Sequence, residues 1–393
     1  MYRARKHETR LLLASRPTLY ALLGVGRWLP GGIRQVPRLG WVVTDPVLAR
    51  AVLNDPAHFT LLGEGGVGHL WAQVLGDWVY RLFDGPGHAD LRSRSRELFT
   101  DETSRRLVRR VMGPTVEAAM GALRSGRTVD LARLSRTLVG HMVADMLGLG
   151  TQTDGHALEV FEAGERLAGL AMNSAASTEL PPSVIAKARP IIDSLTREVP
   201  SAFRSAPEDT LLGRCRALGL SLQEASGLAT LMMVAGTETA ASAMGRIVAL
   251  LHDTGQQQVI HDDPTRIQHA VWEGLRVTTP APVIGRHVSA AVTVGGRNLS
   301  AGDRILLLTY VANNRIGPFD INRGYVPDVR QLWFGAGRHL CLGAALARAE
   351  INFLLRSLVD TGRPWQVVSR RYGTRVLIPS YSALGVRLSK GAV

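Results

Sequence analysis

A single cysteine stands in a glycine-punctuated segment near the end of the chain, FGAGRHLCLG at residues 334–343. Gly335 and Gly337 free the backbone for a tight turn whose amides can point at the Cys341 sulfur. An apolar helical pattern follows directly, and a cysteine at the start of a helix has its thiolate favoured by the helix dipole and by backbone N–H groups. The chemistry expected of this segment is therefore that of a thiolate.

A thiolate in this position could be a nucleophile, a redox thiol or a metal ligand. A redox role lacks a resolving cysteine nearby, because Cys215 is distant in the chain. A zinc site needs more Cys or His ligands than the neighbourhood supplies, with only His339 close. One thiolate in a glycine-shaped pocket fits the axial ligand of haem iron better. For the residue taken alone, a structural cysteine is the alternative.

A second polar group interrupts a long apolar helical pattern. Ser221 and Glu224 form a Ser-x-x-Glu capping box, after which the helical pattern continues to about residue 252. A helix of about 30 residues is ~46 Å long, enough to cross a domain. Because most of its faces are apolar, we expect a buried central helix. In its middle lies Ala-Gly-Thr-Glu-Thr, residues 235–239, where packing alone favours leucine. The alternative for these residues is the polar N-cap of a broken helix.

The other elements follow from periodicity and turn residues. Residues 33–44 contain two short strand patterns around a turn, and Asp45-Pro46 opens a helix because proline is tolerated in the first helical turn. Residues 90–275 are helical nearly throughout, whereas the segment after 280 reads as short strands separated by glycine turns. We therefore predict a mainly α-helical α+β protein with a small strand-rich region, forming one domain over residues 1–393.

Composition narrows the class of protein. The 393 residues are 46% hydrophobic and 20% charged, which allows a sizeable core. Two cysteines and the lack of ~18 consecutive apolar residues favour a cytoplasmic protein without stable membrane insertion, though surface contact by the N-terminal segment stays open. The net charge of +13 is spread along the chain without interleaved aromatics, so it favours an acidic protein partner over nucleic acid.

Several motifs together resemble the cytochrome P450 family in its soluble bacterial form. Phe334-Gly335-x-Gly337-x-His339-x-Cys341-x-Gly343 resembles the haem-ligand loop. Glu273-x-x-Arg276, with Pro280 and Arg286 after it, resembles the family's Glu-x-x-Arg helix. Residues 235–239 resemble the oxygen-activation segment, and Asp84-x-Pro86-x-His88-x-x-x-Arg92 resembles the propionate-binding stretch. The resemblance extends from about residue 30 to the end.

The resemblance implies haem b with Cys341 as its axial ligand. It also implies four side chains that hold the haem propionates, because arginine and histidine suit carboxylates. These are His88, Arg92, Arg286 and His339. The other residues expected at the haem are Phe334, Gly335, Gly343 and Ala235.

The resemblance also implies roles for two further groups of residues. Glu238 and Thr239 form an acid–alcohol pair, in which the hydroxyl and an ordered water deliver protons that the acid relays from solvent. Glu273 and Arg276 begin a buried triad whose third member is expected at Arg323. The stretch around residues 316–318 departs from the family pattern, so Arg315 or Arg330 are alternatives for that place.

The function implied is a haem-thiolate monooxygenase of secondary or specialised metabolism. It takes electrons from an acidic ferredoxin or a flavin redox partner and inserts one oxygen atom from O2 into a lipophilic small molecule. The residues expected to line the substrate pocket are Val234, Ala235, Val283, Ile284 and Tyr381. A peroxygenase, an isomerase or dehydratase of the same family, and a non-catalytic haem-binding protein are the alternatives.

Overall fold

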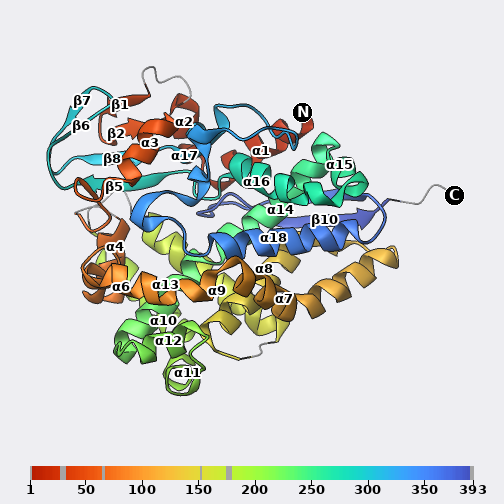
Figure 1. Ribbon diagram of the computed structural model, residues 1–393, viewed down its shortest axis with the longest axis horizontal. Coiled ribbons are helices and arrows are strands. Elements are labelled where there is room, and N and C mark those ends of the chain that lie inside the picture. The colour runs from red at the N-terminus through yellow and green to blue at the C-terminus, as the bar shows by residue number, and fades with distance from the viewer. Residues whose placement is uncertain (1, 27–31, 64–66, 151–152, 174–178, 390–393) are drawn as a thin grey trace.

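The computed structural model describes residues 2–26, 32–63, 67–150, 153–173 and 179–389. Helices make up most of the molecule, and most strands lie together at one side, near the helices α2, α3 and α17 (Figure 1). The prediction of a mainly helical α+β fold is confirmed.

The larger sheet has five strands in the order β1-β2-β8-β5-β3. Its first hairpin is the one expected at residues 33–44, and Gly40 closes it with φ +86°, where an added Cβ would meet the Arg304 carbonyl oxygen at 2.3 Å. Strand β2 pairs parallel with β8, and the other pairs are antiparallel. The strands are β1 (Ile33–Val36), β2 (Gly40–Val43), β3 (Phe59–Thr60), β5 (Ile284–Val288) and β8 (Arg304–Leu307).

Two smaller sheets complete the strand content of the described residues. One has the order β4-β10-β9 and the other is the pair β6-β7. The strands are β4 (Val129–Asp130), β9 (Trp365–Tyr372), β10 (Tyr381–Leu388), β6 (Val292–Val294) and β7 (Arg297–Leu299). The first of these sheets brings the end of the chain against α8 and α14 in the helical body.

The helices begin and end largely where local signals place them. The Asp45 carboxylate accepts from the amides of Val47 and Leu48 at 2.9 and 3.1 Å, so it caps the helix that Pro46 opens. The helices before the central one are α1 (Tyr2–Ser15), α2 (Pro17–Gly26), α3 (Pro46–Leu53), α4 (Val67–Leu75), α5 (Trp78–Leu82), α6 (Gly87–Ser95), α7 (Asp101–Arg124), α8 (Leu131–Leu147), α9 (Asp154–Asn173), α10 (Pro182–Thr196), α11 (Val199–Ser205) and α12 (Leu211–Ala217). Those after it are α15 (Gln257–Asp262), α16 (Ile267–Thr278), α17 (Thr309–Asn314) and α18 (Ala344–Val359).

The central helix is interrupted, which corrects the prediction of one unbroken helix. It consists of α13 (Leu222–Ala235), with the expected capping box, and α14 (Glu238–Thr254). At the break, the Thr237 hydroxyl donates to the Met233 carbonyl at 2.7 Å, a side-chain bond of the kind that bends helices. The Ala241 amide donates to the Thr237 carbonyl at 3.3 Å, so the helix resumes at once.

The core is centred on α14, which packs against α8, α16 and α18. Met244, Ile247 and Val248 on this helix are fully buried. Helix α1 also packs against α14, and the fully buried Arg246 is paired there with Glu8. The N-terminal segment is therefore part of the core rather than an appendage.

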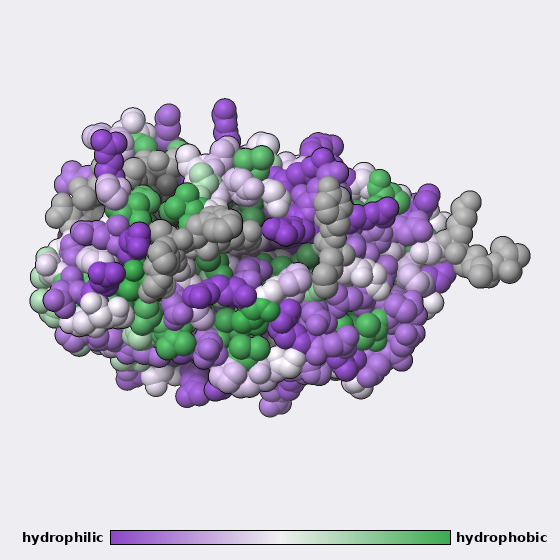
Figure 2. All heavy atoms as spheres, turned by 90° about the horizontal axis from the view of Figure 1, so that it is seen from above, coloured by the Kyte–Doolittle hydropathy of each residue, from purple (hydrophilic) through white to green (hydrophobic). Residues whose placement is uncertain are grey.

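Within the described residues, no helix is long and apolar enough to cross a membrane. The face in Figure 2 carries hydrophilic side chains over most of its area, with apolar ones in smaller groups between them.

Replacing Glu8 by Gln removes the carboxylate that pairs with the buried Arg246 guanidinium. We expect the free energy of unfolding to fall by about 3–5 kcal/mol, because a buried charge then lacks its partner. Urea denaturation followed by circular dichroism measures the change. As a control, Asp90→Asn breaks the exposed pair with Arg94 and should cost less than about 1 kcal/mol. Equal losses in the two variants would contradict the account.

Candidate active site

The segment around Cys341 is a tight loop that leads into α18. The Cys341 amide donates to the Phe334 carbonyl at 2.9 Å, which closes the loop on itself. Gly337 has φ +65°, and an added Cβ would meet the Leu53 carbonyl oxygen at 2.1 Å, so only glycine fits there. At Gly343, by contrast, an added Cβ would meet no protein atom within 4 Å. Gly337 is thus required by the turn, whereas the space beside Gly343 would admit a side chain.

The environment of the Cys341 sulfur has opposing effects on its charge. The side chain is solvent-accessible but densely surrounded by protein at longer range, so it faces an internal space. This burial raises the pKa of the Cys341 thiol, while the Gly343 amide, Arg92 and Arg348 lower it. Such a site favours the thiolate only when a cation binds the sulfur. In contrast, Cys215 is fully buried, and burial raises the pKa of its thiol to about 12, as expected of a structural cysteine.

Basic side chains from three elements gather near the loop. Arg286 on β5 is 6% exposed, and its Nη1 donates to the neighbouring Gly285 carbonyl at 2.8 Å. Burial lowers the pKa of Arg286 to about 10. His88 on α6 lies with its ring centroid 4.7 Å from that of His339. Arg92 donates to the Leu340 carbonyl. The structure therefore brings the four expected propionate-binding residues to the region of the loop.

Asp84 links His339 of the loop to residues 60 and 61 through hydrogen bonds, and this role was not predicted from the sequence. Its carboxylate accepts from His339 Nε2 at 2.7 Å, from the Thr60 hydroxyl at 2.6 Å and from the Leu61 amide at 2.9 Å. Although burial opposes it, these bonds hold the pKa of Asp84 well below its usual range. Burial and the charges of His339 and Arg338 lower the pKa of His88 to about 4. The only sequence signal was the place of Asp84 at the start of the Asp-x-Pro-x-His motif.

These residues fit a haem. A buried arginine that makes no ion pair with a carboxylate among the described residues, together with a second arginine and two histidines, matches two propionates. A cysteine with a solvent-accessible side chain matches an axial ligand. Within the described part of the chain, no three His, Cys, Asp or Glu side chains gather so as to hold a metal ion by themselves, which leaves Cys341 as a single sulfur donor.

The polar residues that follow the break in the central helix differ in burial. Thr239 is half-buried, and its hydroxyl donates to the Ala235 carbonyl at 3.2 Å. Ala235 is exposed to an internal face. Glu238, the next residue to Thr239, is only 5% exposed, and its Oε2 accepts from the Ile378 amide at 3.4 Å. Burial, with a smaller effect of Glu165, raises the pKa of Glu238 to about 8. Near neutral pH this carboxyl can therefore hold a proton that it can give up.

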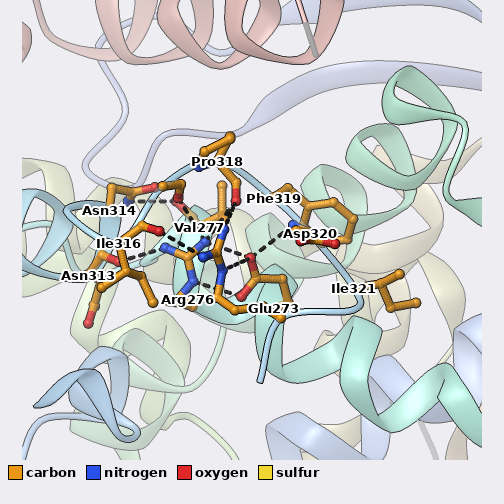
Figure 3. Close-up of polar contacts among 12 residues, drawn as sticks. Glu273, Arg276, Val277, Asn313, Asn314, Ile316, Pro318, Phe319, Asp320 and Ile321 are labelled. Carbon is orange, nitrogen blue, oxygen red and sulfur yellow. Dashed lines mark hydrogen bonds and ion pairs between the residues drawn. The ribbon is translucent and has the colours of Figure 1, made fainter. Parts of the chain in front are cut away.

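Glu273 and Arg276 form a buried ion pair (Figure 3), and the half-buried Arg323 joins it as a third member. Arg276 Nε and Nη2 donate to the two Glu273 oxygens at 2.7 and 2.6 Å, and Arg323 Nε donates to Glu273 Oε1 at 3.2 Å. The unusual stretch 316–318 supplies carbonyls that accept from the two arginines. The alternatives for the third place lie elsewhere: Arg315 pairs with Asp45 at 3.2 Å, and the Arg330 carbonyl accepts from Arg50.

The residues expected to line a substrate pocket are not gathered in one described cavity. Val234 is buried in the main core, and Val283 and Ile284 pack against two smaller apolar clusters. Tyr381 is buried at the start of β10, with its ring centroid 5.7 Å from that of Tyr372. Ordinary core packing therefore accounts for the present contacts of Val234 and Tyr381, and the substrate-lining role of all five residues stays a prediction.

Comparison with known proteins gives a consistent result. The profile described as "Cytochrome P450" matches residues 265–361. Cytochrome P450-SU2 of Streptomyces griseolus is 30% identical over 342 residues, which are 81% of this chain and 79% of that protein. Cytochrome P450 165C4 of Amycolatopsis orientalis is 28% identical over 338 residues, 81% and 78% of the two chains. A solved structure of a mutant of P450 EryK in complex with erythromycin B superposes with a TM-score of 0.77 at 23% identity, covering 97% of this chain and 99% of that one.

Replacing Arg286 by Gln removes a buried cation from the cluster that fits the propionates. We expect haem to leave the variant roughly 10–100-fold faster, because a charge-assisted hydrogen bond contributes about 1.5–3 kcal/mol. Transfer of haem to an excess of apomyoglobin, followed in the Soret band, measures the rate. Arg94→Gln is the matched control, since Arg94 is exposed and pairs with Asp90. Equal rates of haem loss in the two variants would remove Arg286 from the haem site.

Proposed function

The chain belongs to the cytochrome P450 family and is a haem monooxygenase, and from that premise we propose that it inserts one oxygen atom of O2 into a lipophilic substrate of specialised metabolism. The observation that carries this proposal is the Cys341 loop. There, a backbone amide and two arginines oppose the effect of burial on a sulfur that is solvent-accessible, so a bound cation would complete the stabilisation of a thiolate. No neutral ligand donates as much electron density to iron.

The cofactor would be haem b, held by residues of the loop and of the basic cluster around it. When bound, the haem supplies the iron at which O2 is reduced and cleaved. Cys341 would be the axial ligand, and Arg286, Arg92, His88 and His339 would hold the propionates. Phe334, Gly335, Gly343 and Ala235 would lie against the porphyrin. The fit of the donors supports this assignment, because a buried arginine without an acid is costly until an anion arrives.

The chain's part in the reaction is to move protons and exclude water. Insertion of one oxygen atom consumes two electrons and two protons, and the second oxygen atom leaves as water. Glu238 would deliver these protons, since its pKa of about 8 keeps the carboxyl protonated near neutral pH. Thr239, adjacent on α14, would hold an ordered water with its hydroxyl. Above about pH 8 Glu238 loses its proton, so we expect proton delivery to weaken there.

The substrate would be a lipophilic small molecule, because the residues expected to face it are mostly apolar. They are Val234, Ala235, Val283, Ile284 and Tyr381. The EryK structure with erythromycin B shows that this fold accommodates such a ligand in another protein. Likeness at this level concerns the fold alone, so it does not choose a substrate for this chain.

The electrons would come from an acidic ferredoxin-type protein or from a flavin protein. Arg92 and Arg348 both act on the Cys341 sulfur, so they lie on the thiolate side of the site. Arg338 and the arginines of residues 92–96 extend this basic surface. A net charge of +13 further favours an acidic partner. Such an association weakens as salt is raised.

Turnover under 18O2 tests the proposed function. A set of steroid, fatty-acid and macrolide probes is first screened for a shift in the haem spin state, and a probe that shifts it is then oxidised with NADPH, ferredoxin and ferredoxin reductase. We expect product that carries one 18O atom, with electron supply required. Product that forms only with added peroxide would indicate a peroxygenase. Rearranged or dehydrated product without 18O would indicate a non-oxygenating member of the family.

A further inference from the structure

A small cavity lies on the side of α14 where Glu238 is buried, between α8, α9 and the start of β10. It offers about 10 Å³ to the centre of a water molecule, the space that one water needs. Its polar lining residues are Arg136, Glu165, Glu238, Ser242, Ser380 and Tyr381. Two carboxyl groups from different helices therefore border one water-sized space.

Glu238 forms the inner end of this cavity. Its Oε2 is held by the Ile378 amide, but Oε1 is buried and has no hydrogen-bond partner among the described residues. A buried oxygen without a partner is costly, and a water in the adjoining space is the partner that the geometry permits. The Glu238 carboxyl is thus fixed at one oxygen and free to exchange a proton at the other.

Glu165 forms the outer end. Its side chain is 24% exposed, so one carboxyl group borders both the cavity and the solvent. Arg136 lies beside it, with Nη2 at 4.0 Å from Glu165 Oε1. Arg136 is itself held in place, because it donates to the Tyr381 carbonyl at 3.4 Å and its guanidinium lies 5.7 Å from the centre of the Phe161 ring. Glu165 therefore lines the cavity beside a cation that is itself packed in place.

Neighbouring charged groups raise or lower the pKa values of Glu238 and Glu165. Around Glu238, burial and Glu165 raise the pKa, whereas Arg16 and Arg136 lower it. Around Glu165, burial and Glu162 raise the pKa, whereas Arg136 and Arg166 lower it. Glu165 is therefore near enough to act on the Glu238 carboxyl, as the outer member of a proton path through one water must be.

We propose that Glu165 is the residue through which protons from solvent reach Glu238, by way of a water in the cavity between them, with Arg136 positioning it. The inference rests on the proposed function. In each transfer one O–H bond breaks and one forms: Glu165 gives its proton to the cavity water, that water gives one to Glu238, and bulk water reprotonates Glu165. The path has no redox step and no co-reactant other than water.

The test has two readouts on the haem-loaded, full-length chain. The first is an infrared pH titration of the Glu238 carboxyl in the resting enzyme, its band identified by its loss in Glu238→Gln. Glu165→Gln removes a negative neighbour, so the midpoint should fall by about one pH unit. Arg16→Gln removes a positive neighbour, so the midpoint should rise. A variant that merely loosened the fold would admit water and lower the midpoint in both cases.

The second readout is the product formed per reductant consumed, measured with the probe that yields 18O-labelled product. Glu165→Gln should lower it severalfold and release more peroxide, as Thr239→Ala should, and Glu165→Asp should recover part of it. Glu159→Gln is the matched control, because Glu159 is exposed on the same helix, does not line the cavity and is not among the charges that act on Glu165; it should behave like the unaltered chain.

Three results would overturn the inference: an unmoved Glu238 midpoint in Glu165→Gln, a fall of that midpoint in Arg16→Gln as well, or unchanged coupling in Glu165→Gln. A moved midpoint with unchanged coupling would make Glu165 a charged neighbour that carries no protons. Failure of the proposed function shows differently, as the lack of 18O-labelled product from the unaltered chain. Normal coupling of Glu165→Gln beside an active unaltered chain is a failure of this inference alone.

Discussion

The proposed bond between the Cys341 sulfur and haem iron would require an anion inside the protein, where an unpaired charge is costly. Burial alone keeps this sulfur protonated, as its raised pKa shows. The opposing contributions come from separate elements: the Gly343 amide from the loop, Arg92 from α6 and Arg348 from α18. A bound haem iron would supply the remaining stabilisation. The tight turn at Gly337 and the packing of α18 against α7 and α16 keep these groups in place.

The same cost of burying charge explains the rest of the arrangement. Arg286 is buried and makes no ion pair with a carboxylate among the described residues, although Asp84 acts on its charge. Asp84 itself satisfies His339 and joins the loop to the end of β3. Glu273 is satisfied by two arginines, and Arg246 by Glu8 of the first helix. Arg286 and the half-satisfied Glu238 are the groups to which the proposed chemistry assigns a cofactor and a proton.

Local features of this fold could be predicted from the sequence, because their signals lie within a few residues. The hairpin at residues 33–44, the helix capped by Asp45 and the capping box at Ser221 are of this kind. The haem-side motifs could be recognised because their spacing is specific. The roles of Cys341, Glu238 and the propionate-binding residues remain predictions that the geometry allows.

Partners from distant segments could not be predicted. Glu8 and Arg246 are far apart in sequence, and nothing in either helix indicates the other. The choice of Arg323 over Arg315 depends on how residues 316–323 turn back toward α16, which local propensity does not determine. The break at residues 236–237 was hidden because the apolar pattern continues through it, while a side-chain bond from Thr237 competes with the helix. The cavity between Glu165 and Glu238 arises only when four elements pack together.

The reduced carbon monoxide spectrum of the haem-loaded chain tests the central claim most directly. Carbon monoxide binds opposite the axial ligand, so the position of the Soret band reports whether that ligand is a thiolate. The account predicts a band at the position characteristic of the family, and its loss in Cys341→His with haem retained. A freshly prepared unaltered chain whose band lies where histidine-ligated haem proteins absorb would contradict it.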